Sequence, residues 1–120
     1  MAFIHRSLSE TQASLLASIS KAIPDGLLVV HDGQILYAND RTYKMLDLSA
    51  HASLESWQRY IHPSDLAYVN AYLCDPWEHD IDTPVVECTL VSAQGIERDV
   101  ELRTVRLPIE DLQATLVLVR

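Results

Sequence analysis

The sequence predicts a single α+β domain built around an antiparallel β-sheet. Apolar residues recur at helical spacing in the N-terminal part of the chain and alternate with polar residues between positions 86 and 105. Two further runs, residues 27–30 and 115–119, are apolar at nearly every position. A strand that is apolar on both sides is covered on both faces. We therefore expect these two strands at the centre of the sheet, with a helix over its outer surface.

Composition restricts the class of protein. The 120 residues suffice for one hydrophobic core, and 48% apolar against 22% charged residues is typical of a folded domain. The formal net charge of -8 disfavours binding to nucleic acid or to an anionic membrane. No apolar run reaches about 18 residues, and the N-terminus lacks a secretory hydrophobic segment, so we expect a cytoplasmic location.

The N-terminal residues predict a helix that stops at a proline. Ser7 with Glu10 fits a capping box at its start, and Ser9 with Gln12 fits one equally well. Pro24 disfavours helical geometry in the residue before it and ends the helix near there. Its apolar side is formed by Leu8, Leu15, Leu16, Ile19 and Ile23.

A β-hairpin is predicted next. Residues 27–30 and 35–37 flank the turn pair Asp32-Gly33, which favours a tight connection. Asn39 then suits the N-cap of a short helix.

A longer helix is predicted from Pro63, because proline at the first helical position removes no helical hydrogen bond. We expect this helix to end near Pro76. Residues 86–91 and 100–105 then alternate as two strands around a turn at 93–95, and residues 115–119 form the last strand.

The order of these elements and several local motifs resemble the PAS domain family, the sensory box domain of bacterial signalling proteins. The motifs are Ile-Pro-Asp-Gly at 23–26, Ile-Leu-Tyr-Ala-Asn-Asp at 35–40, Tyr-Ile-His-Pro-Ser-Asp at 60–65, and Gly95 in the later hairpin. The resemblance implies a five-stranded antiparallel sheet that cups a small cavity under short helices. It divides the chain into an N-terminal amphipathic helix, residues 1–22, for capping or dimerisation, and a PAS sensor domain, residues 23–120.

Two departures from the family pattern are visible. Family members usually carry a glycine after the helix that Asn39 begins, and Asp47 occupies that place here. The family's signalling segment typically opens Asp-Ile-Thr after the last strand, and the sequence given stops at Arg120 just before that point. We therefore expect an effector domain C-terminal to this segment.

The cofactors of some PAS relatives are disfavoured. Haem-binding relatives use a histidine of the long helix, and none occurs in the helix predicted here. Flavin-binding photoreceptor relatives carry Asn-Cys-Arg-Phe-Leu-Gln before that helix, where this chain has Leu-Glu-Ser-Trp-Gln-Arg at 54–59. The acidic stretch 75–82 lacks the glycine that a hard-cation loop usually needs, so no metal site is expected. Cys74 and Cys88 lack CxxC spacing and are expected as buried, reduced thiols.

The cavity candidates are the residues whose alternation or helical phase points inward. Most such residues are ordinary core, and Tyr43, Thr104 and Thr115 are the ones that offer polar groups to a ligand. The full set is Leu28, Val30, Tyr43, Leu46, Leu66, Val69, Leu73, Cys88, Leu90, Leu102, Thr104, Thr115 and Val117.

These residues bear on three candidate functions. The first is a sensor that binds a small, mostly apolar molecule in the cavity and regulates an effector. The second is a ligand-free interaction module, a homodimer with an interface formed by Leu8, Leu15, Leu16 and Ile19. The third, an enzyme, is disfavoured because neither GxSxG nor HExxH occurs and His62 is explained by the start of a helix.

Overall fold

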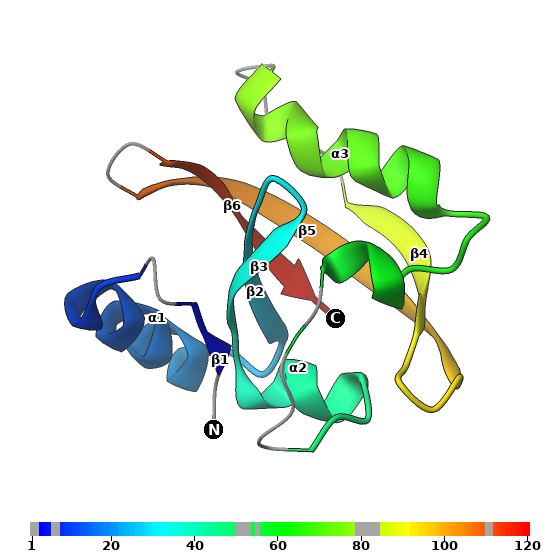
Figure 1. The fold of residues 1–120 in the computed structure, drawn as a ribbon, viewed down its shortest axis with the longest axis horizontal. Coiled ribbons are helices and arrows are strands. Elements are labelled where there is room, and N and C mark those ends of the chain that lie inside the picture. The colour runs from blue at the N-terminus through cyan, green and yellow to red at the C-terminus, as the bar shows by residue number, and fades with distance from the viewer. Residues whose placement is uncertain (1–2, 6–7, 50–53, 55, 79–84, 110–111) are drawn as a thin grey trace.

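One antiparallel sheet with helices on both sides forms the molecule (Figure 1). The computed structural model describes residues 3–5, 8–49, 54, 56–78, 85–109 and 112–120, and in 74–78 it describes the backbone alone. The strands found in these ranges are arranged in the order β1-β3-β2-β6-β5-β4. They are β1 (Phe3–Ile4), β2 (Gly26–His31), β3 (Gln34–Ala38), β4 (Val86–Val91), β5 (Glu97–Ile109) and β6 (Leu112–Val119).

The two apolar strands lie at the centre of the sheet, as expected. β2 pairs with both β3 and β6, and β6 pairs with both β2 and β5. Leu27 and Val29 are fully buried. The five expected strands are all present, and the described residues form a sixth. The additional strand, β1, pairs with the outer edge of β3 over two residues, which is too short to show an alternating pattern.

The helices divide between the two faces of the sheet and create two hydrophobic clusters. On the inner face lie α2 (Asp40–Met45), the 3₁₀ helix η1 (Trp57–Tyr60) and α3 (Leu66–Glu78), whose apolar side chains pack with those of β2, β4, β5 and β6. On the outer face lies α1 (Glu10–Ala22), whose apolar residues form a cluster with residues of β2 and β3, with residues 107–109 of β5 and with residues 112–118 of β6. No described helix is long and apolar enough to cross a membrane.

Helix α1 begins with the second of the two possible capping boxes. Ser9 Oγ accepts a hydrogen bond from the Gln12 N–H at 3.1 Å, and Gln12 Oε1 accepts one from the Ser9 N–H at 2.9 Å. Leu8 therefore precedes the helix instead of belonging to it. The helix ends at its C-cap residue Ile23, directly before Pro24, as the sequence predicted.

Helix α3 differs from the prediction at both ends. It begins at Leu66 rather than Pro63, because residues 63–65 form a turn in which His62 Nδ1 accepts a hydrogen bond from the Ser64 N–H at 3.1 Å. At its other end it continues past Pro76 to Glu78. Proline lacks the N–H of a regular helical bond, so the last turn forms with one hydrogen bond fewer instead of stopping.

The outer edge of β4 is occupied by the segment that leads into α3. Thr89 donates its N–H to Asp65 Oδ2 at 2.8 Å and accepts the His62 N–H at 2.9 Å. The Tyr68 hydroxyl donates to the carbonyl of Glu87, and Ile61 forms an isolated bridge with Leu90. Backbone groups of this edge strand are therefore already paired within the chain.

Candidate functional site

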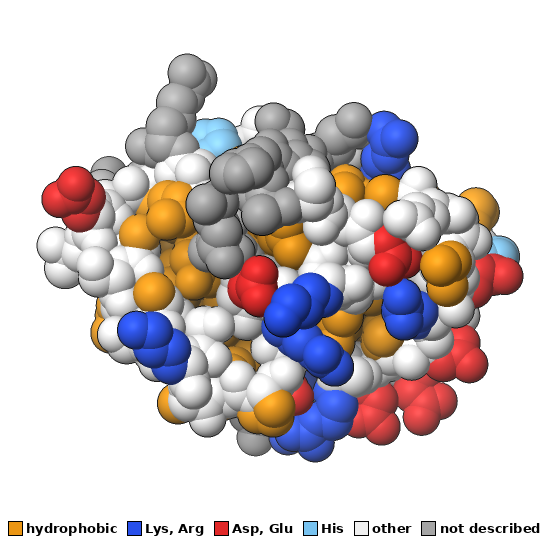
Figure 2. All heavy atoms as spheres, turned by 90° about the horizontal axis from the view of Figure 1, so that it is seen from below, with side chains coloured by type: hydrophobic (Ala, Val, Ile, Leu, Met, Phe, Trp, Pro, Cys, Tyr) orange, Lys and Arg blue, Asp and Glu red, His pale blue; other side chains and the backbone are white. Residues whose placement is uncertain are grey.

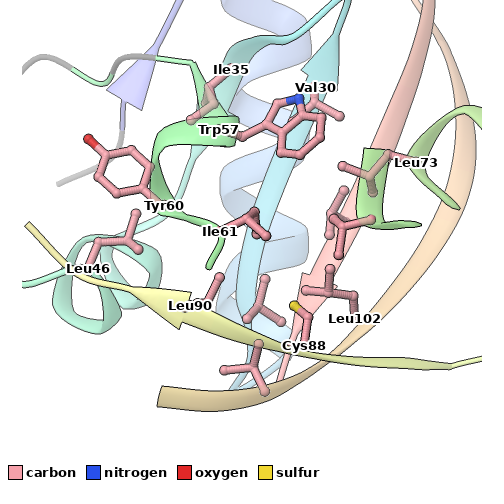
Figure 3. Close-up of a cluster of buried hydrophobic side chains, with 14 of the residues drawn as sticks. Val30, Ile35, Leu46, Trp57, Tyr60, Ile61, Leu73, Cys88, Leu90 and Leu102 are labelled. Atoms are coloured by element: carbon pink, nitrogen blue, oxygen red, sulfur yellow. The ribbon is translucent and has the colours of Figure 1, made fainter. Parts of the chain in front are cut away.

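A small cavity lies between the inner face of the sheet and α2, η1 and α3, where PAS-like cavities are expected. Its volume is about 40 Å³. Figure 3 shows the Trp57 ring beside Val30, while the Tyr60 hydroxyl points away from the cluster. The lining is Leu28, Val30, Ile35, Thr42, Met45, Leu46, Trp57, Tyr60, Ile61, Val69, Leu73, Leu90, Leu102, Val117 and Val119.

Most of the predicted apolar candidates line this cavity. The structure brings together Leu28, Val30, Leu46, Val69, Leu73, Leu90, Leu102 and Val117. It places the other candidates outside the lining, namely Tyr43, Leu66, Cys88, Thr104 and Thr115. Strand alternation and helical phase indicate which side chains point inward, but not which of them reach the cavity.

The lining residues that sequence reasoning missed include two from η1 and its C-cap residue, besides Ile35, Thr42, Met45 and Val119. Trp57, Tyr60 and Ile61 are all buried and cover the cavity from the side opposite the sheet. Their spacing of three and four residues was a usable signal of a short helical turn with one apolar side. The sequence predicts Ile35 on a strand, but alternation does not reveal its face, because the pairing of β2 with β3 shifts register between Val29 and Val30.

The predicted polar groups are used inside the protein. The Thr115 hydroxyl donates to the carbonyl of Leu73 at 3.3 Å. Burial raises the pKa of Tyr43, and the neighbouring Tyr60 raises it further. Among the described residues, no buried side-chain nitrogen or oxygen lacks a hydrogen-bond partner. Among the described residues, the cavity therefore has no buried side-chain polar atom that needs a hydrogen bond from a ligand.

Thr42 connects the cavity to a buried polar network centred on Asn39. The Thr42 hydroxyl lies 2.8 Å from Asn39 Oδ1, which also accepts the N–H groups of Leu27 and Thr42, both at 3.0 Å. Asn39 Nδ2 donates to Ser20 Oγ at 2.8 Å and to the carbonyl of Asp25 at 3.1 Å. The N-cap of α2 thus holds the start of β2 and the last turns of α1 together.

Haem and flavin do not fit this cavity. Pockets for drug-sized ligands have volumes of roughly 300–1,000 Å³, whereas this one has about 40 Å³. Helix α3 contains no histidine that would bind a haem iron. Cys88 is buried, and burial together with the nearby Asp65 raises the pKa of its thiol to about 11, which suppresses nucleophilic thiolate.

No metal centre is found in the part of the chain that the structure describes, since nowhere there do three His, Cys, Asp or Glu side chains converge. The acidic stretch 75–82 lies outside the described side chains. His62 has a structural position: besides its contact with Ser64, its Nε2 lies 3.2 Å from Glu97 Oε1.

The dimer candidates separate into two pairs. Leu8 and Leu16 are buried against the outer face of their own sheet, so they are not available on the monomer surface. Leu15 is 61% exposed and Ile19 is 38% exposed. Figure 2 shows one face of the molecule on which exposed hydrophobic side chains adjoin a group of basic side chains and a group of acidic ones.

The chain matches the model of a known protein family. The PAS domain family model matches residues 14–83, which is more than half of the chain. Among curated proteins there is no significant match.

Solved structures show the same fold. The PAS domain of an HTR-like protein from Haloarcula marismortui is 22% identical, with 92% of each chain covered and a TM-score of 0.69. A PAS domain from a two-component sensor histidine kinase is 20% identical, with 94% of this chain and 98% of that chain covered and a TM-score of 0.72. An RNA-binding light-oxygen-voltage receptor is 17% identical over 81% of this chain and 27% of its own, with a TM-score of 0.61.

Proposed function

Since the chain belongs to the PAS domain family, we propose that it is a cytosolic, non-enzymatic signal-relay domain that acts as a homodimer on an effector and carries neither haem nor flavin. The observation that carries this proposal is the filled core: a cavity of about 40 Å³ whose buried polar neighbours are all paired among the described residues. A domain with so little internal space transmits a signal through its surface and its packing.

The homodimer is supported by apolar side chains left open on the outer side of the sheet. Leu15 and Ile19 of α1 are exposed, and Val105 of β5 is 51% exposed. Val105 pairs with Leu116, which is partly buried and packs against the cluster under α1. Exposed apolar side chains that adjoin a packed helix are typical of a surface that a partner covers. The effector is proposed because a similar PAS domain comes from a sensor histidine kinase.

Native mass spectrometry with an absorbance spectrum tests both parts of the proposal. We expect a dimer mass with no additional bound mass, and no absorbance above the aromatic band. Leu15→Asp and Ile19→Asp are expected to shift the protein to monomer, because a charge at a covered apolar surface is costly to desolvate. Ile96→Asp is the matched control, since Ile96 is 46% exposed at the turn between β4 and β5. A monomeric parent protein, or a co-purifying cofactor, would contradict the proposal.

A second candidate function is the binding of a very small apolar molecule. It is favoured by the composition of the cavity lining, which consists of apolar side chains apart from Thr42 and the polar atoms of Trp57 and Tyr60. Thermal-shift screening with small metabolites tests it. A metabolite that raises the melting temperature of the parent protein in proportion to its concentration would favour this function over the ligand-free one.

A further inference from the structure

The carboxylate of Asp25 is nearly buried, and it is paired with the residue that follows β6. Only 11% of the Asp25 side chain is exposed, whereas the Arg120 side chain is 71% exposed. Arg120 Nε lies 3.4 Å from Asp25 Oδ1, and no other described residue forms an ion pair or a hydrogen bond with this carboxylate. A carboxylate with little access to water is costly without a cation. Asp25 therefore favours the arrangement that keeps Arg120 beside it.

Strand pairing places these two residues opposite each other. Gly26 of β2 pairs with Val119 of β6 in antiparallel register, so Asp25 stands across from Arg120. Arg120 also extends the pairing of β6 with β5, because its N–H donates to the Glu101 carbonyl at 3.0 Å and its carbonyl accepts the Glu101 N–H at 2.9 Å. The ion pair thus joins the entry to β2 to the end of β6.

The backbone of Asp25 belongs to the network centred on Asn39. Its carbonyl accepts a hydrogen bond from Asn39 Nδ2 at 3.1 Å, and the same nitrogen donates to Ser20 Oγ at 2.8 Å. The neighbouring Gly26 is closely packed, since a Cβ atom there would lie 3.1 Å from Thr42 Oγ1. Three consecutive contacts therefore connect Ser20, in the last turn of α1, with the end of β6.

Two members of this series each have two partners in it. Asn39 Nδ2 donates to Ser20 and to Asp25, while Asp25 binds Asn39 through its backbone and Arg120 through its side chain. A displacement of either residue therefore alters both of its contacts. Hydrogen-bond networks of this kind can carry energetic coupling between separate positions, and such coupling acts equally in both directions.

We propose that the contacts Ser20–Asn39–Asp25–Arg120 couple the docking of α1 on the sheet to the position of the end of β6. With α1 docked, Ser20 and Asn39 hold the backbone of Asp25, and Asp25 holds Arg120. When α1 is displaced, Asn39 loses an acceptor, Asp25 loosens and Arg120 is released. The inference rests on the proposed signal relay and names the residues through which the signal passes.

Arg120→Gln tests the coupling in one direction through amide hydrogen exchange. Glutamine keeps a polar side chain but leaves the Asp25 carboxylate without its cation. We expect amides in the last turn of α1 to exchange at least about fivefold faster, while the Val69 N–H of α3 stays unchanged. Arg103→Gln is the matched control, since Arg103 is an exposed arginine of β5 that forms no ion pair with a described residue.

Ser20→Ala tests the opposite direction. Because coupling is reciprocal, we expect the Arg120 N–H, which donates to β5, to exchange faster by a similar factor. Ser18→Ala, at an exposed position of α1, is the matched control and should leave this N–H unchanged. In the double variant Ser20→Ala/Arg120→Gln, exchange in the last turn of α1 should rise by less than the product of the two single effects, since either change already interrupts the series.

The outcomes separate this inference from the proposed function. If each variant speeds exchange only at its own end, or if the Val69 N–H accelerates by the same factor, the two ends are not coupled and the inference is wrong. The signal relay then still stands if native mass spectrometry finds a dimer without a cofactor. If the ends are coupled but the parent protein is monomeric, the coupling stands and the proposed homodimer is wrong.

Discussion

Asp47 has a left-handed backbone, with φ of 55°, at the position where the sequence departs from the family's glycine. This conformation costs a residue with a side chain roughly 1 kcal/mol or more relative to glycine, and somewhat less for aspartate. The carboxylate recovers part of this cost, since its two oxygens lie 3.3 and 3.4 Å from Arg98 on β5. The side chain thus joins the end of α2 to the β4–β5 hairpin at the expense of local strain.

Two substitutions at this position separate the strain from the ion pair. Asp47→Ala keeps the unfavourable backbone and removes the pair, so we expect it to lower the free energy of unfolding by about 0.5–1 kcal/mol. Asp47→Gly also removes the pair but relieves the backbone, and we expect it to be about 1 kcal/mol more stable than the alanine variant. Urea unfolding measures both, and equal stability of the two variants would show that the backbone is unstrained.

The buried thiol of Cys88 predicts a loss of stability in alkaline solution. Its pKa is raised from 9.0 to about 11, so the folded protein keeps the proton that the unfolded chain releases. The stabilising contribution is complete below about pH 9 and is lost as the pH rises from 9 to 11. Two pKa units correspond to roughly 2–3 kcal/mol.

Urea unfolding between pH 8 and 11 under reducing conditions measures this loss. Cys88→Ala is expected to show a shallower decline than the parent protein, while the buried tyrosines affect both proteins alike. Parallel pH profiles would contradict a raised thiol pKa.

At the scale of the elements, α1 is attached to the domain by a partly buried polar contact as well as by its apolar side. Ser20 accepts a hydrogen bond from Asn39 at 2.8 Å, whereas Ser18 of the same helix is exposed. Ser20→Ala leaves one Asn39 donor without its partner, so we expect a loss of about 1 kcal/mol and faster amide hydrogen exchange in the last turns of α1. Ser18→Ala gains the same helix propensity and is expected to be neutral or slightly stabilising. Identical exchange in both variants would show that the contact does not hold the helix.

The boundaries of elements show what the sequence could predict. The central strands, the first hairpin, the N-cap at Asn39 and the end of α1 were predictable because period, proline and turn residues all agreed there. The start of α3 was not, since the turn that delays it depends on the ring nitrogen of His62. The burial of Leu8 also had no signal in helical phase, because this residue packs from the segment before the helix.

At the scale of the whole molecule, the cavity predicts how the free energy of unfolding changes when a buried side chain is shortened. Leu102 lines the cavity and is 3% exposed. Leu102→Ala is expected to lower the free energy of unfolding by about 3 kcal/mol and to leave a dry apolar space. Benzene, which occupies such engineered spaces in proteins, is expected to raise the melting temperature of this variant and not that of the parent.

Ile96→Ala, at an exposed position, is the control and is expected to change stability by less than about 0.5 kcal/mol. Equal stabilisation of parent and variant by benzene would show that the parent cavity already admits a ligand.

The candidate site was predictable only in part for a geometric reason. Strand alternation identified the floor of the cavity, including Val30, Leu102 and Val117. It carries no information on which helical segment closes the space, and the closure by Trp57 and Tyr60 reduces the volume. Whether an inward side chain touches a cavity or only the residue in front of it depends on this closure.

The occupied edge of β4 has a consequence for how the protein behaves in concentrated solution. Exposed edge strands are where folded proteins recruit foreign strands and begin to grow fibrils. Here the carboxylate of Asp65, the amide of His62 and the hydroxyl of Tyr68 already bind backbone groups of Thr89 and Glu87 that a foreign strand would need. Ordered growth from this side of the sheet is thereby blocked.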